Sequence, residues 1–321
     1  MNELSELTIE KSYYTKQDIV SLLKIIDKKA LADMYDLAQD INKRNFGSKV
    51  LRCGLIESSN YCDKNCLYCR IRRSNEKIIR FRLSQKEILK LCHKADKTGY
   101  NSILLQSGED SDYSFEDILD TIGQIKKSTK LSVILATGEK TELEYKTLKE
   151  AGADSYILKH ETSDPILYRQ IHPDMKYSNR IKCLRVLKQL GYTIGSGILV
   201  GLPGQTFESI ANDILLFKEL DVDIIDIGPY LPYAETPLAR KFQQAGGYFA
   251  PAIGFFDVNE MIFKIIAITR IVTGKTLIPF TPNFNAINFE NGKELSLKRG
   301  ANMILEDLIS HKYVHFLRSQ I

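Results

Sequence analysis

The chain has 321 residues, of which 44 are Lys or Arg and 40 are Asp or Glu, so its formal net charge at pH 7 is +4. Basic and acidic residues interleave, which gives no reason to expect nucleic acid or an anionic membrane as a partner. Six cysteines are too few for a disulfide scaffold. The N-terminus lacks the apolar core of a signal peptide, and no apolar run reaches the ~18 residues of a membrane-spanning helix. We therefore expect a cytoplasmic protein.

The first 45 residues are expected to form a helical extension. Thr15 can cap a helix in which apolar residues recur at helical spacing, and a second such run extends from Leu31 to Ile41. We assign residues 1–45 to an N-terminal helical cap and residues 46–321 to a single main domain, because no linker or low-complexity segment interrupts the rest of the chain.

From residue 50 onward, strand-like apolar runs alternate with amphipathic helical patterns. The predicted strands are 50–56, 102–106, 131–136, 155–158, 193–200, 224–227, 276–280 and 303–305. The predicted helices between them are 84–98, 115–127, 142–151, 178–190, 206–220 and 257–272. Eight strands alternating with helices indicate parallel βα units, and the number matches an α/β fold of the (β/α)8 TIM-barrel type. A doubly wound open sheet is the alternative.

Three cysteines follow the first predicted strand closely. Cys62, Cys66 and Cys69 have three and then two residues between them. Iron–sulfur cubes are held by four cysteine thiolates, so three leave one iron open, and an open metal position is where substrates or cofactors bind. A zinc knuckle is an alternative, but no second pair of ligands lies nearby. Buried free thiols are another, although residues 63–65 are polar. The pattern predicts chemistry at an iron cluster.

Polar residues and glycines follow the predicted strands. In a barrel these segments share one rim, because the active sites of such barrels lie at the carboxyl ends of the strands. The segments are 106–110, 137–139, 159–162, 201–204, 228–230 and 281–283. We expect them to surround a ligand, whereas the isolated Cys53, Cys92 and Cys183 are interpreted as core thiols or as thiols packed behind the residues of the site.

The cysteine spacing, with Tyr68 just before Cys69, resembles the signature of the radical S-adenosylmethionine (SAM) enzymes. The resemblance implies one 4Fe-4S cluster, whose open iron binds the methionine part of SAM. It also implies reductive cleavage of SAM to a 5'-deoxyadenosyl radical, a reaction that belongs to the cofactors while the protein supplies position and shielding.

A second segment carries the same resemblance. Ser107-Gly108-Glu109 stands where radical SAM enzymes have a Gly-Gly-Glu type motif that contacts the amino group of the methionine. A glycine permits close backbone approach, and a carboxylate suits a cationic amine.

Several segments together resemble the HydE family of FeFe-hydrogenase maturases, which are kin of biotin synthase and methylornithine synthase. The segments are 61–68, 106–110, 160–162, 201–206, 227–229 and 236–239, and the resemblance covers roughly residues 45 to 305. It implies action on a cysteine-bound iron that carries carbon monoxide and cyanide. Two alternatives remain open: a related enzyme acting on a small organic substrate, and a non-catalytic protein with a closed metal site.

By position, the resemblance implies roles for further residues. Glu161 would hold the ribose of SAM, and Arg180 would hold its methionine carboxylate; a structural ion pair is the alternative for both. Lys159 and Thr281 would lie at the substrate end, where a cation suits an anionic ligand set. The implied cofactor-binding set is Tyr68, Gln106, Ser107, Gly108, Glu109, Glu161 and Arg180. The implied partners are a small-molecule or organometallic substrate, a low-potential electron donor and other hydrogenase maturases.

Two residues depart from this family where we expect the substrate end. Arg299 stands where the family commonly has cysteine, and Pro282 replaces an expected threonine. His160, in contrast, is interpreted as a packed residue rather than a ligand, because it alternates with Glu161 along the predicted strand end.

Overall fold

Eight parallel strands form a single sheet in the structure, a computed structural model that describes residues 11–244, 257–288 and 290–309. The predictions made for residues 1–10 and 310–321 lie outside this part of the chain. The strands are β1 (Leu51–Ser59), β2 (Ser102–Ser107), β3 (Ser132–Ala136), β4 (Ser155–Ile157), β5 (Thr193–Val200), β6 (Ile224–Pro229), β7 (Pro279–Phe280) and β8 (Met303–Asp307).

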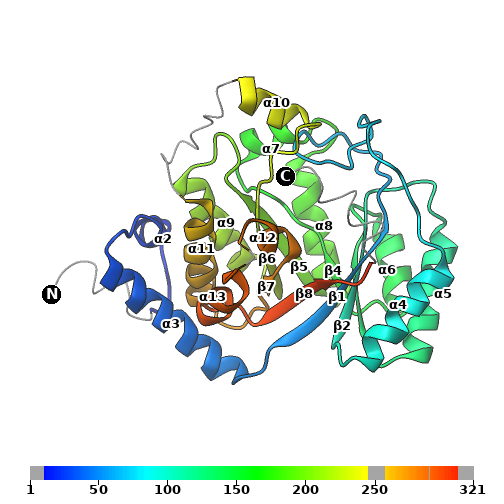
Figure 1. Cartoon of the computed structure of the whole chain (residues 1–321), viewed down its shortest axis with the longest axis horizontal. Coiled ribbons are helices and arrows are strands. Elements are labelled where there is room, and N and C mark those ends of the chain that lie inside the picture. Colours follow the sequence, from blue (N-terminus) through cyan, green and yellow to red (C-terminus); the bar gives the residue numbers. More distant parts are fainter. Residues whose placement is uncertain (1–10, 245–256, 289, 310–321) are drawn as a thin grey trace.

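The strand order is β6-β5-β4-β3-β2-β1-β8-β7, so β1 lies between β2 and β8 and the order otherwise follows the chain. The two ends of the sheet meet at the amino end of β6. There the backbone N of Ile225 donates to the carbonyl O of Leu277 at 2.8 Å, and the N of Leu277 donates to the O of Asp223 at 2.7 Å. The fold is therefore the expected (β/α)8 barrel, nearly closed, and not a doubly wound open sheet (Figure 1).

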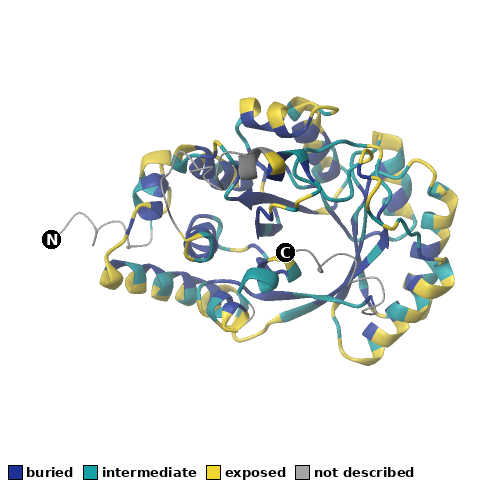
Figure 2. Ribbon diagram, turned by 45° about the horizontal axis from the view of Figure 1, so that its top comes forward, coloured by how far each residue is buried: buried dark blue, intermediate teal, exposed yellow. Residues whose placement is uncertain are grey.

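The helices cover the outside of the barrel, with their buried sides on the strands and their exposed sides outward (Figure 2). Those that follow the strands are α4 (Gln85–Lys97), α5 (Phe115–Ser128), α6 (Glu142–Glu150), α8 (Tyr177–Gln189), α9 (Phe207–Glu219) and α11 (Val258–Thr273). None of the helices among the described residues is both long enough and apolar enough to span a lipid bilayer.

The N-terminal segment contains two helices, α2 (Lys16–Leu23) and α3 (Lys28–Phe46). Thr15 caps α2 as predicted, and with Asp18 it forms a capping box that satisfies backbone donors at the start of the helix. These helices pack against α9 and α11 on the outside of the barrel. The boundary that we place at residue 45 stays a prediction.

Four short helices were not predicted from the sequence. They are α7 (Pro165–Ile171), α10 (Pro237–Gln244), α12 (Pro282–Ile287) and α13 (Gly292–Lys298). Three of them begin with proline directly after Asp164, Thr236 or Thr281, a capping residue followed by proline at the first helical position. This signal was present in the sequence. The strand expected over 276–280 is also shorter, since Leu277 forms only the isolated bridge that closes the barrel.

Alternate side chains along each strand point into the barrel. The amino-terminal half of this interior is a small apolar cluster of Cys53, Leu55, Leu104, Ile134, Ile224 and Met303. Two residues further along β1, β2 and β6, the inward positions hold Glu57, Gln106 and Asp226, which line a cavity. Because side chains alternate along a strand with a period of two, the cavity has an apolar floor and polar walls.

Candidate active site

The cysteine loop begins where β1 ends, and it is tied to neighbouring loops by backbone hydrogen bonds. The N of Asp63 donates to the O of Glu109 at 2.7 Å, and the N of Cys69 donates to the O of Cys66 at 3.2 Å. Arg80 donates to four carbonyl oxygens of residues 60–75, including that of Ile71 at 2.7 Å. The loop is therefore a fixed turn that keeps its three thiols at the carboxyl end of the barrel.

Gly108 lets the second strand's loop approach the cysteine loop closely. A Cβ at this position would clash with the backbone O of Tyr61 and with the Cβ of Cys62, two atoms that cannot swing away. Gly138, in the loop after β3, likewise permits a close approach, because a Cβ there would overlap the side chain of Glu109. The two glycines thus set the place of Cys62 and Glu109.

We predict that Gly108→Ala displaces the cysteine loop. Overpacking against fixed backbone typically costs about 1 to 3 kcal/mol, and the shift of Cys62 should lower the iron bound per chain after anaerobic reconstitution. Gly123→Ala is the matched control. Gly123 lies inside α5 with open space around it, so alanine should stabilise the helix by about 0.5 to 1 kcal/mol. Full iron binding by the Gly108 variant would contradict the prediction.

The three thiols lie close enough to influence one another. Burial raises the pKa of Cys66, and the neighbouring Cys69 and Cys62 raise it further. Burial and Cys62 likewise raise the pKa of Cys69 to about 12. Three thiolates would therefore repel one another here unless a cationic group joined them. Among the described residues, no group of three or more His, Cys, Asp or Glu side chains surrounds a single point that could hold one metal ion. A cube spreads its cysteine ligands over separate irons, and the thiols fit that group.

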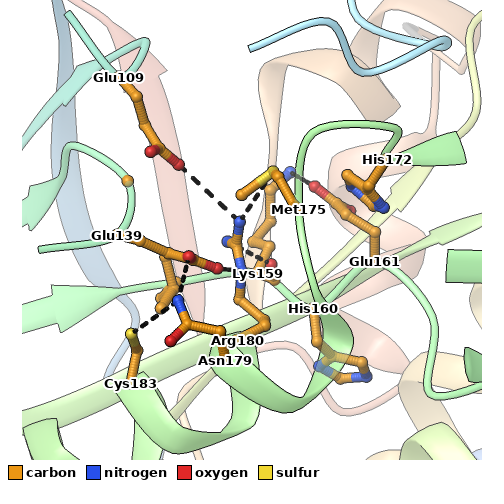
Figure 3. Close-up of polar contacts among 12 residues, drawn as sticks. Glu109, Glu139, Lys159, His160, Glu161, His172, Met175, Asn179, Arg180 and Cys183 are labelled. Atoms are coloured by element: carbon orange, nitrogen blue, oxygen red, sulfur yellow. Dashed lines mark hydrogen bonds and ion pairs between the residues drawn. The ribbon is translucent and has the colours of Figure 1, made fainter. Parts of the chain in front are cut away.

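Arg180 lies between two carboxylates beside the cysteine loop (Figure 3). Its Nε donates to Glu139 Oε1 at 2.9 Å, and its Nη1 donates to the carbonyl O of Lys159 at 2.9 Å. Its Nη2 lies 4.0 Å from Glu109 Oε1 and 3.7 Å from the sulfur of Met175, and that sulfur is 4.0 Å from the sulfur of Cys66. Glu109 and Arg180 thus present opposite charges side by side next to the thiols.

Glu161 has a left-handed backbone conformation and a side-chain oxygen without a hydrogen-bond partner among the described residues. Its φ is +61°, in the left-handed region that costs a non-glycine residue about 1 to 3 kcal/mol. Its N donates to the O of Gly197 at 2.9 Å, and its O accepts from the N of Leu199 at 3.1 Å, which holds this conformation. Its Oε2 is buried and has no hydrogen-bond partner among the described residues. A buried carboxylate oxygen without a partner fits a hydroxyl donor supplied by a ligand.

Tyr68 is fixed by a histidine in the segment between α7 and α8. Its Oη lies 3.0 Å from Nε2 of His172 and 3.5 Å from Oε1 of Glu161. His172 Nδ1 lies 3.1 Å from the carbonyl O of Tyr168, which can only accept. Burial and then Arg180 lower the pKa of His172 to about 3, so the ring is neutral with its proton on Nδ1. Tyr68 therefore donates to His172, which leaves the Glu161 carboxylate free of this proton.

A cavity of about 310 Å³ lies between the cysteine loop and the carboxyl ends of the strands. Its lining includes Tyr68, Cys69, Gln106, Lys159, Glu161 and Thr281, which the sequence analysis singled out. Lys159 Nζ lies 3.6 Å from Glu161 Oε1 and 3.5 Å from Asp226 Oδ2. Gly197 on β5 makes room for this lysine, because a Cβ there would clash with its Cδ. The cavity is thus a polar space next to the thiols.

The structure corrects one prediction about the substrate end. Arg299 does not line the cavity; its guanidinium lies between the rings of Tyr35 on α3 and Phe263 on α11, 4.3 and 4.2 Å from their centroids. Arginine stacks well on aromatic rings, which accounts for its place outside the strands. Pro282 and Thr281 do line the cavity. Thr281 is also the N-cap of α12 and accepts from the N of Phe284.

His160 is packed, as expected. It is fully buried, and its Nδ1 lies 2.9 Å from the hydroxyl of Ser196 while its ring packs on Phe217. Cys53, Cys92 and Cys183 are buried as well, in line with their interpretation as core thiols.

Several residues that the fold brings to the site have no role predicted from the sequence. Glu139 lies in the loop after β3, within the segment 137–139 that the strand-end rule lists. Asp226 points inward from within β6, where the alternation of side chains along the strand could have indicated it. Met175 and His172 lie in the segment between α7 and α8, which the sequence analysis did not place near the strands.

Comparison with known proteins agrees with this geometry. Residues 56–217 match the family model of the radical SAM superfamily. The FeFe-hydrogenase maturase subunit HydE of Thermotoga maritima is 38% identical over 305 residues, which are 95% of this chain and 83% of that protein. The 3-methylornithine synthase of Methanosarcina acetivorans is 28% identical over 97% of this chain and 84% of that protein. The crystal structure of methylornithine synthase superposes with a TM-score of 0.81 at 27% identity, covering 94% of this chain and 85% of the other.

A TIM-type barrel with a three-cysteine loop at the end of its first strand, matched to these relatives, defines an iron–sulfur enzyme that uses SAM. The chain belongs to the radical SAM superfamily, and its branch contains HydE, methylornithine synthase and biotin synthase. Its cofactors are a 4Fe-4S cluster and SAM, as expected from the sequence.

Proposed function

We propose that this enzyme acts in the maturation of the di-iron site of FeFe-hydrogenase, as a HydE-type protein. The observation that carries the proposal is the 38% identity to HydE over 95% of the chain. The substrate would be a small organometallic compound that enters this cavity. A bound 4Fe-4S cluster supplies the electron that cleaves SAM to methionine and a 5'-deoxyadenosyl radical.

We propose that Cys62, Cys66 and Cys69 hold three irons of the cluster. The donor chemistry supports this role, since three close thiols need a cationic group to be ionised together. The hydrogen bonds of Arg80 and the tight packing of Gly108 would keep the loop in place while the cluster changes charge.

We propose that Glu109 and Arg180 bind the two charged groups of the methionine part of SAM. Their charged atoms lie 4.0 Å apart, and an α-amino and an α-carboxylate group are also close neighbours. Glu139 holds Arg180 in place from its other side. Gly108 and Ser107 bring the backbone close, and Glu161 would accept from the ribose through its unused oxygen. Tyr68 and Gln106 complete the cofactor side of the cavity.

Lys159 and Thr281 stand at the substrate end in this proposal, with Pro282 beside them. The cysteine loop, Tyr230 and the apolar residues of α7 pack together over one side of the cavity, which would exclude water from the reacting atoms. A low-potential electron donor and other hydrogenase maturases are the proposed partners, and the cytoplasm is the proposed location.

A specific observation also favours a second function. The structure of methylornithine synthase resembles the chain at a TM-score of 0.81, so a related reaction on a small organic molecule is the second candidate. Restoration of hydrogenase activity in a strain that lacks HydE separates the two, because only a maturase would restore it.

The radical SAM assignment is tested by anaerobic reconstitution. We expect about four irons per chain and an electron paramagnetic resonance spectrum of the reduced cluster that changes when SAM is added. A spectrum that SAM leaves unaltered would indicate a closed cluster and would refute the proposal.

A further inference from the structure

The cavity beside the cysteine loop is lined by two cationic side chains, and they differ in how they are partnered. Lys159 lies between Glu161 and Asp226, at 3.6 and 3.5 Å from their oxygens. Two carboxylates more than neutralise one ammonium group, so Lys159 has little attraction left for an anion. Arg70 also lines the cavity, and the ion pairs found among the described residues do not include it.

Arg70 carries hydrogen-bond donors that nothing in the described part of the chain accepts. Its Nε and Nη1 are both buried and have no hydrogen-bond partner there. Buried donors are almost always paired in folded proteins, and a guanidinium is charged at every physiological pH and can only donate. An arginine left in this state is prepared for an acceptor that arrives with a ligand, and an anionic oxygen group suits it best.

The backbone and the ring next to Arg70 keep its side chain in this place. Arg70 directly follows Cys69, and its carbonyl O accepts from Nδ2 of Asn75 at 2.8 Å. Its guanidinium carbon lies 5.6 Å from the ring centroid of Tyr233, which also lines the cavity. The cation is thus oriented before a ligand binds, which reduces the entropy lost on binding.

We propose that Arg70 is a specificity-determining residue that binds an anionic group of the substrate, of the carboxylate class. This inference rests on the proposed function, in which the cavity receives the substrate. The anionic group would bind at the wall that the cysteine loop forms, and the Lys159 side would face the rest of the substrate. In this inference Arg70 attracts the anionic group, a role that the sequence predicted for Lys159.

The test compares two probes that differ in one group, L-cysteine and cysteamine, which lacks the carboxylate. Both are titrated calorimetrically into the anaerobic enzyme loaded with cluster and SAM. Arg70→Gln is expected to weaken L-cysteine binding about tenfold to a hundredfold, the range for a charged hydrogen bond, and to leave cysteamine binding unchanged. Arg70→Lys, which keeps the charge, should recover part of the loss.

Arg73→Gln is the matched control, because Arg73 belongs to the same loop but is exposed and does not line the cavity. It should bind both probes as the unmodified enzyme does. Equal changes for the two probes in the Arg70→Gln enzyme, or no change, would overturn the inference, and so would equal affinities in the unmodified enzyme. Iron content and SAM affinity are measured on the same samples. Their absence in the unmodified enzyme would refute the proposed function itself, which is a different result.

Discussion

Replacing Cys66 with alanine is expected to abolish the cluster and reduce SAM cleavage to background. Two remaining thiolates cannot hold a cube that normally takes four ligands, of which this loop supplies three. Cys66 is the middle cysteine, its sulfur lies 4.0 Å from Met175 beside Arg180, and both other thiols influence its charge. The measurements are iron per chain after anaerobic reconstitution and the 5'-deoxyadenosine formed with a chemical reductant.

Cys92→Ala provides the control for this experiment. Cys92 is also buried, but it lies on α4 at the outside of the barrel. The change should cost about 0.5 to 3 kcal/mol of stability, as is usual for a small core truncation, and should leave iron content and SAM cleavage as they are. If the Cys66 variant kept its iron and its cleavage activity, the cluster would have to be held elsewhere, and the assignment of the loop would be wrong.

The barrel was predictable from the sequence because its strands are buried on both faces. Such strands read as continuous apolar runs, and segments such as 193–200 were found with their observed bounds. The start of α2 could also be predicted from the sequence, since Thr15 caps this helix as expected. The closure of the barrel between β6 and β7 could not be predicted from the sequence. It depends on two backbone hydrogen bonds around Leu277, and no side-chain pattern reports these.

The site was only partly predictable, for a physical reason. The strand-end rule collects the residues at one rim, but it does not show which charges neutralise each other there. Lys159 is predicted from the sequence to attract an anionic ligand set, but the sequence does not show that Asp226 and Glu161 lie on either side of it. Arg70 sits in a strongly basic segment, and only the three-dimensional structure shows that its donors are buried and unused. Arg299 is expected at the substrate end from its place in the family pattern. The rings of Tyr35 on α3 and Phe263 on α11 that surround it are distant in sequence, so their contact with it could not be foreseen.

The second large effect is expected at Glu161. Glu161→Gln keeps the size of the side chain and removes its charge, so hydrogen bonds from the ribose of SAM would no longer reach a carboxylate. Such bonds contribute about 1.5 to 3 kcal/mol, and SAM affinity should therefore fall about tenfold to a hundredfold. The cluster should assemble normally, since Glu161 is not among the proposed ligands. The free energy of unfolding should change little, because Lys159 keeps Asp226 as a partner and the replaced Oε2 had none among the described residues.

Asp221→Asn is the control for backbone strain as well as for charge. Asp221 and Glu161 are the non-glycine residues with positive φ in the described part of the chain, at +48° and +61°. Asp221, however, is exposed at the surface, where it pairs with Lys188 at 2.8 Å. The control should bind SAM with unchanged affinity. Should the Glu161→Gln enzyme also bind SAM normally while retaining its iron, then the strained backbone and the unused oxygen serve the fold rather than the cofactor. If only the Glu161 variant loses affinity, the left-handed turn after β4 exists to hold this carboxylate at the ribose.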